Sequence, residues 1–192
     1  DIIASVQAGM SDIEEHMLHF LENHDEQRIA SPEFAGSAEK AKPAMVISTL
    51  ISRSPTMLYF GQEVGEAGAL DSGFGDPSRT TIFDYAGVPA HQRFMNGGKF
   101  DGGQSTAEEK ALREFYRGVL NLSHTDVIAV GDYQELHSHN INAGQGYNNK
   151  LFAFTRATHA QKWIVISNFS AQKSGPLRLS LPASYVTAWA LD

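Results

Sequence analysis

Apolar residues near the start of the chain fall into two short runs on either side of a helical pattern. The runs are HMLHFLE at 16–22 and TMLYF at 56–60, and their length suits strands covered on both faces, as parallel strands are. Between them, Ser37 can cap a helix whose apolar stripe continues to Arg53, with Pro43 in the first turns. Strand, helix and strand in this order predict a right-handed parallel βαβ unit.

The segment after the second run changes character twice. Residues 61–104 are rich in glycine and have no sustained periodicity, which predicts a long loop. Thr106 and Glu109 then have the spacing of a capping box, which predicts the start of a helix that runs through Leu120. The apolar residues on one face of this helix are Leu112, Phe115, Tyr116, Val119 and Leu120.

The first residues of the chain also have helical spacing. Ile2, Ile3, Val6 and Met10 form an apolar stripe for which we expect no preceding cap. Neither an initiator methionine nor the basic and apolar regions of a signal peptide is found here. We therefore expect the chain to be a fragment of a longer protein.

After about Asp126 the period changes from helical to short runs rich in β-branched and aromatic residues. Gly, Pro and Asn separate these runs, which are VIAV, LFAFTR, KWIVISNF, LRLSL and YVTAWAL. This pattern predicts a small antiparallel β-domain. The fold class is therefore α/β followed by all-β, with a boundary between residues 124 and 125.

Three polar residues end the first apolar run. Asn23, His24 and Asp25 lie within FLENHDEQR at 20–28, where a buried strand would deliver them to its carboxyl end. In α/β barrels the loops at that end of the strands form the active site, so these residues are the leading site candidates. Arg28 is expected to pair with Asp25 or with Glu22.

The segments FLENHDEQR, TMLYFGQEVGE and RTTIFDYAGVPAHQRFMNGGKFDGG together resemble the α-amylase family of glycoside hydrolases. The resemblance covers most of the chain and matches the carboxyl-terminal part of such an enzyme. It implies that residues 1–124, with the long loop 61–104, are the C-terminal part of a (β/α)8 TIM barrel. Residues 125–192 would then form a small antiparallel β-sandwich domain.

The resemblance also implies roles for individual residues. Asp25 would stabilise the transition state, His24 would bind sugar hydroxyls, and Asn23 and Arg28 would complete the substrate-binding set. Two positions depart from the family pattern. Ser54 replaces a glycine, and Ala86 replaces a bulky aromatic residue, which removes part of a sugar-stacking surface.

Retaining glycosidases need a nucleophile and a proton donor roughly 5 Å apart. In the α-amylase family these are an Asp and a Glu on earlier strands, which this chain does not contain. We therefore expect a fragment of a retaining hydrolase of α-glucans such as starch and maltooligosaccharides, inactive by itself and completed by the missing N-terminal part of its barrel. The alternative is a non-catalytic carbohydrate-binding or scaffold module.

Composition limits the other partners. A net charge of −7 without a Lys/Arg cluster argues against nucleic acid, and no apolar run approaches the roughly 20 residues of a membrane span. The absence of cysteine excludes disulfides and thiolate chemistry. No cofactor is expected in this chain, although the resemblance allows Ca2+ in the parent enzyme. A polysaccharide substrate favours an exported parent, periplasmic or extracellular.

Several other residues invite functional interpretations. His137 and His139 would share one face of a strand and could hold zinc, but no third ligand is near, so we expect a surface pair and no metal site. Glu63 is expected to serve loop backbone groups, and NGGKFDGG at 96–103 to form turns. The loop aromatics are expected to anchor the loop more than to stack on sugars, and they are Tyr85, Phe94 and Phe100.

Overall fold

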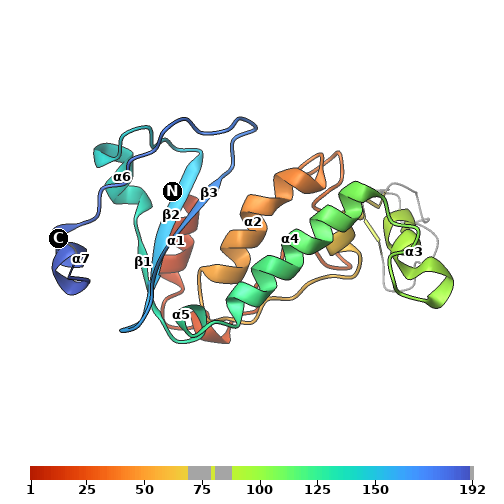
Figure 1. Ribbon diagram of the computed structural model, residues 1–192, viewed down its shortest axis with the longest axis horizontal. Helices are drawn as coiled ribbons and strands as arrows, with labels where there is room; N and C mark the ends of the chain where they lie inside the picture. The colour runs from red at the N-terminus through yellow and green to blue at the C-terminus, as the bar shows by residue number, and fades with distance from the viewer. Residues whose placement is uncertain (69–78, 81–87, 191–192) are drawn as a thin grey trace. The chain divides into compact units, whose positions relative to one another are not determined.

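A computed structural model of the protein describes residues 1–68, 79–80 and 88–190 (Figure 1). The chain forms two compact units, each built from segments that are separate in sequence. Unit 1 comprises Asp1–Met17, Leu50–Ser54 and Leu122–Asp192, and unit 2 comprises Leu18–Thr49 and Pro55–Asn121. The division into domains 1–124 and 125–192 stays a prediction.

Two helices dominate unit 2. α2 (Ala38–Leu50) and α4 (Ala107–Ser123) lie side by side (Figure 1). Met45 of α2 packs with Leu112 and Tyr116 of α4, and all three side chains are buried. The partly buried residues around this cluster are Leu21, Ala38, Leu58, Phe115 and Leu120.

Both of these helices were expected from their apolar stripes, and both are confirmed. The predicted capping box is present, because Glu109 N donates to Thr106 Oγ1 at 3.2 Å and Thr106 N donates to Glu109 Oε2 at 2.9 Å. Pro43 lies within the first two turns of α2, as expected.

The two predicted parallel strands are much shorter than expected. In the part of unit 2 that the structure describes, His19 and Thr56 form an isolated parallel bridge. His19 N donates to Pro55 O at 2.9 Å, and Met57 N donates to His19 O at 2.8 Å. The parallel direction is confirmed. The strands predicted over 16–22 and 56–60 are wrong, because among the described residues the pairing of these two segments is limited to this one bridge.

The predicted loop 61–104 contains short helices. Its described residues include η2 (Gln62–Val64), α3 (Pro89–Met95) and η3 (Asn96–Gly98). The turn prediction for 96–103 is confirmed, because five of these residues have positive φ angles. They are Asn96, Gly97, Gly98, Phe100 and Gly102. Sequence periodicity missed α3 because a helix of 7 residues shows less than two full turns of pattern.

Unit 1 contains the sheet. β1 (Asp132–Glu135), β2 (Leu151–Ala157) and β3 (Lys162–Asn168) pair antiparallel in the order β1-β2-β3. The central strand β2 is buried along nearly its whole length. A hydrophobic cluster forms around it, made of Leu136, Tyr147, Leu151, Ala153 and Tyr185 with Leu177, Leu179, Leu181 and Trp189.

The antiparallel sheet is confirmed, but three of the five predicted strands are wrong. VIAV lies in α5 (Asp126–Ala129), YVTAWAL contributes most of α7 (Ala183–Ala188), and LRLSL is reduced to a bridge between Gln145 and Arg178. Val127 and Ile128 are almost fully buried within α5, so tertiary packing overrides the β propensity of this run. The described residues form one small sheet with helices, and a second sheet, as a sandwich requires, is not found among them.

The expected helix at the start of the chain is α1 (Ile2–Gly9). The expectation that it lacks a cap is wrong, because Asp1 accepts hydrogen bonds from Ile3 N at 2.8 Å and Ala4 N at 3.4 Å. None of the residues of α1 is buried.

Within unit 1, Arg156 joins segments far apart in sequence. Its side chain is buried on β2 and donates to Ile51 O at 3.1 Å and to Ile128 O. A guanidinium can do this because its N–H groups form a rigid fork.

The Leu112→Ala variant tests the core of unit 2. Leu112 is 3% exposed on α4, whereas Leu122 at the end of the same helix is 42% exposed. Leu112→Ala should lower the free energy of unfolding by about 2–5 kcal/mol, because truncation leaves a cavity beside Met45 and Tyr116. Urea denaturation followed by circular dichroism measures the change, with Leu122→Ala as the control. Equal losses in both variants would contradict the assigned core.

Candidate functional site

The loop that carries the predicted site is closed at its base by a buried ion pair. Glu22 and Arg28 are both fully buried, and Arg28 Nη1 lies 2.8 Å from Glu22 Oε1. The other carboxylate oxygen of Glu22 accepts a hydrogen bond from Ile29 N at 2.7 Å. The five residues from 23 to 27 therefore form a loop whose two ends are held together by this pair, which is the base of the loop.

Arg28 also joins this loop to two other segments of unit 2. Nη1 donates to Phe60 O at 2.7 Å, and Nε donates to Thr80 Oγ1 at 2.7 Å. The guanidinium carbon lies 4.4 Å from the centre of the Tyr59 ring and 4.7 Å from that of Phe60. Such cation–π contacts are strongest when the cation is desolvated, as it is here.

Burial raises the pKa of Glu22 above its usual value, and the charge of Arg28 and the N–H of Ile29 oppose this rise. Both neighbours therefore favour the charged form of this carboxyl, whereas burial favours its neutral form.

Asn23, His24 and Asp25 lie together above this base. Asn23 Oδ1 accepts hydrogen bonds from Asp25 N at 2.8 Å and Glu26 N at 2.9 Å, which makes an Asx turn. His24 Nε2 lies 3.3 Å from Asp25 Oδ2, and both side chains are more than half exposed. The imidazole and the carboxylate can therefore contact a ligand in solution.

The structure separates the four predicted site residues into two groups. Asn23, His24 and Asp25 share the exposed loop, whereas Arg28 lies beneath it with Glu22 as its partner. Of the two partners that the sequence left open for Arg28, the structure selects Glu22. The fully buried side chain supports the loop, and a direct contact between Arg28 and a sugar stays a prediction.

A second buried carboxylate organises the neighbouring loop. Glu66 is 1% exposed and accepts hydrogen bonds from Gly68 N at 3.1 Å, Ala90 N at 2.8 Å and His91 N at 3.1 Å. Gly61 is needed beside it, because its φ is +82° and an added Cβ would lie 3.1 Å from the Cβ of Glu66. Glu22 was named from the sequence only as a partner for Arg28, and Glu66 was not named at all, although it follows directly on a glycine-rich run.

Glu63, Phe94 and Phe100 were also singled out from the sequence. Glu63 is partly exposed in η2, and the neighbouring Gln62 is the buried side chain, which donates to Tyr116 Oη at 3.2 Å. The Phe94 ring lies under Arg113 at 4.6 Å, which fits anchoring of the loop, and Phe100 is exposed. Tyr85 and Ala86 lie outside the described residues.

The predicted geometry of the histidine pair is wrong. His137 and His139 lie on a helix, α6 (His137–Ala143), and not on a strand. His137 is buried, with Nδ1 2.9 Å from Leu151 O and 3.0 Å from Tyr147 Oη, while His139 is exposed with Nε2 3.1 Å from Ser180 Oγ. No group of three metal-ligating side chains occurs among the residues that the structure describes.

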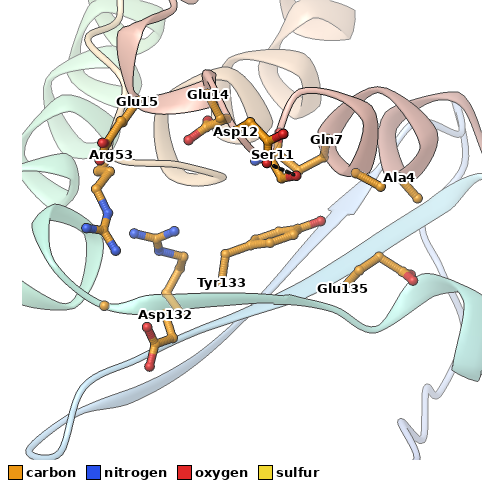
Figure 2. A pocket seen from close by; sticks show the side chains of 13 residues that line it. Ala4, Gln7, Ser11, Asp12, Glu14, Glu15, Arg53, Asp132, Tyr133 and Glu135 are labelled. Carbon is orange, nitrogen blue, oxygen red and sulfur yellow. Dashed lines mark hydrogen bonds between the residues drawn. The ribbon is translucent and has the colours of Figure 1, made fainter.

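Unit 1 contains a separate hollow of about 590 Å3. Figure 2 shows the Tyr133 ring between β1 and the side chains of Gln7 and Glu14, with Arg53 at one end. Burial raises the pKa of the Tyr133 hydroxyl above its usual value. Besides Arg53 and Arg156, the charged residues that line the hollow are Asp12, Glu14, Glu15, Asp132 and Glu135. Because carboxylates outnumber guanidinium groups, the hollow suits a neutral or cationic hydrogen-bonding ligand better than an anion.

Comparison with known proteins gives a match at the level of fold. No family model and no curated protein sequence matches the chain. Among solved structures, a crystal structure of AmyP in complex with maltose is similar with a TM-score of 0.52 and 18% identity over 85% of this chain. The chain spans about a third of that protein, because the match covers 34% of it. None of the described helices is long and apolar enough to cross a membrane.

The Asn23→Ala variant tests the turn that carries His24 and Asp25. Loss of the Oδ1 acceptor leaves two backbone N–H groups to solvent and should lower the free energy of unfolding by about 1 kcal/mol or less. Asn23→Asp keeps an acceptor at this position and should retain most of the stability. Hydrogen exchange at the amides of Asp25 and Glu26 gives the local measurement. Unchanged protection of both amides in Asn23→Ala would contradict the turn.

Proposed function

We propose that this chain is the carboxyl-terminal part of a retaining glycoside hydrolase of the α-amylase type that acts on α-glucans. The observation that carries the proposal is the exposed loop with Asn23, His24 and Asp25 on a rigid, buried base. It is supported by the similarity in fold to AmyP, whose crystal structure contains maltose. In this proposal the segments around His19 and Thr56 belong to the last two strands of a (β/α)8 barrel, and the sheet of unit 1 belongs to a C-terminal β-sandwich.

Each residue of the loop has a role that its chemistry permits. The carboxylate of Asp25 would stabilise positive charge on an oxocarbenium-like transition state, because such electrostatic contacts strengthen as the charge develops. The imidazole of His24 would hydrogen-bond sugar hydroxyls, and Asn23 would hold the turn and border the sugar. Arg28 would act from beneath the loop.

The remaining chemistry would come from the rest of the protein. A nucleophilic Asp and an acid/base Glu are required roughly 5 Å apart, and the upstream part of the barrel would supply both. The parent would be exported, in keeping with a polymeric substrate, and the resemblance to the α-amylase family allows Ca2+ in it.

The Asp25→Asn variant of the full-length protein tests this proposal. The amide keeps the shape of the side chain but not its charge, so kcat on soluble starch should fall by about 10²–10³-fold. Glu26→Gln is the matched control, since it removes one exposed carboxylate from the adjacent position of the same loop, and it should retain activity. The isolated 192-residue chain should show no turnover. Full activity of Asp25→Asn would refute the assigned role.

A non-catalytic carbohydrate-binding module is the second candidate, and the polar hollow around Tyr133 favours it. Calorimetric titration of the chain with maltose distinguishes the two. If the hollow binds sugar, Arg53→Ala, which removes an exposed side chain from its lining, should weaken binding by about tenfold through loss of a hydrogen bond, and His24→Ala should not. If the loop binds sugar, the effects of the two variants should be reversed.

A further inference from the structure

The buried pair of Glu22 and Arg28 brackets the exposed residues of the proposed site. It joins the residue before Asn23 to the residue after Gln27, so it fixes the distance between the two ends of this stretch. Glu22 is bound a second time through Ile29 N. Neither end of the loop can therefore move without breaking a buried contact.

Arg28 fixes this base relative to the rest of unit 2. Its guanidinium donates to Phe60 O and Thr80 Oγ1, and its carbon lies 4.4 Å from the centre of the Tyr59 ring and 4.7 Å from that of the Phe60 ring. These contacts use both the fork geometry and the flat faces of the group. A lysine could keep the charge, but it could not make the same set of contacts.

The residues above the base are held weakly by comparison. His24 and Asp25 contact each other at 3.3 Å with side chains 53% and 71% exposed, and exposed pairs of this kind contribute little to stability. Their orientation therefore follows from the turn at Asn23 and from the fixed ends of the loop.

We infer that Glu22 and Arg28 are positioning residues for Asp25 and His24. The inference rests on the proposed function, since it assumes that Asp25 and His24 contact the substrate. Loss of the pair would leave both side chains present but displaced. A displacement of about 1 Å at a reacting group can cost about 100-fold in rate.

The test uses the full-length protein with two conservative variants. Arg28→Lys retains the positive charge and loses the fork, while Glu22→Gln retains an acceptor for Ile29 N and loses the negative charge. The control is Arg117→Lys, which makes the same chemical change away from the loop. Arg117 forms an exposed ion pair with Glu114 on α4.

At a temperature well below the melting transition of each variant, kcat on soluble starch should fall about 10–100-fold in Arg28→Lys and in Glu22→Gln, with a smaller change in KM. In Arg117→Lys both constants should stay unchanged. Line broadening or a shift of the His24 ring signal in the NMR spectra of Arg28→Lys and Glu22→Gln would show directly that the loop has moved.

Two results would overturn the inference. One is wild-type kcat in folded Arg28→Lys and Glu22→Gln protein, with only the melting temperature lowered. The other is a failure of both variants to fold, which would assign the pair to global stability. Failure of the proposed function has a different signature, because the full-length wild-type protein would then show no turnover of soluble starch, or Asp25→Asn would retain full activity, whatever the result for Arg28→Lys.

Discussion

A buried ion pair determines how the site loop of this protein is built. Removing Glu22 and Arg28 from water costs several kcal/mol for each ion, and this cost is offset only when every remaining hydrogen-bonding position finds a partner in good geometry. The pair meets most of this requirement through Ile29 N, Phe60 O and Thr80 Oγ1. The same requirement restricts the loop, since few arrangements of the three segments satisfy it together.

The second buried carboxylate follows the same principle with backbone N–H donors in place of a guanidinium. Glu66 accepts three backbone N–H groups, so its charge is stabilised by peptide dipoles and the loop amides are not left unsatisfied. The chain must approach it closely, which explains the glycine with positive φ at position 61. Loops with little regular structure thus obtain a defined conformation from buried acids, which is what a binding surface made of loops requires.

The parts of the fold that the sequence predicted well are those specified locally. α4 follows from its apolar stripe at 3.6 spacing, and its start follows from Thr106 and Glu109. α2 forms where it was expected, although its apolar residues are spread around the helix. The residues VIAV carry no period that separates a buried helix from a buried strand, and packing of Val127 and Ile128 decided the outcome. For LRLSL and YVTAWAL, propensity alone suggested strands that the tertiary contacts of unit 1 did not form.

The candidate site shows the same division. Asn23, His24 and Asp25 could be named from the motif, and their Asx turn depends on neighbours in sequence. The partner of Arg28 could not be chosen from sequence, because both Glu22 and Asp25 lie within reach of its long side chain. The choice depends on Phe60 and Thr80, which are 32 and 52 positions away and supply the remaining contacts.

Burial thus separates the charged residues within 20–28 into two groups with different roles. The charges that never meet solvent hold the backbone, and the charges that do meet solvent are left available for a ligand. His24 and Asp25 contact each other too weakly to keep a conformation by themselves, so they can exchange this contact for bonds to a ligand at little cost. If Arg28 were at the surface instead, its guanidinium would compete with such a ligand for the carboxylate of Asp25. Its position beneath the loop, paired with Glu22, removes that competition while keeping the loop in place.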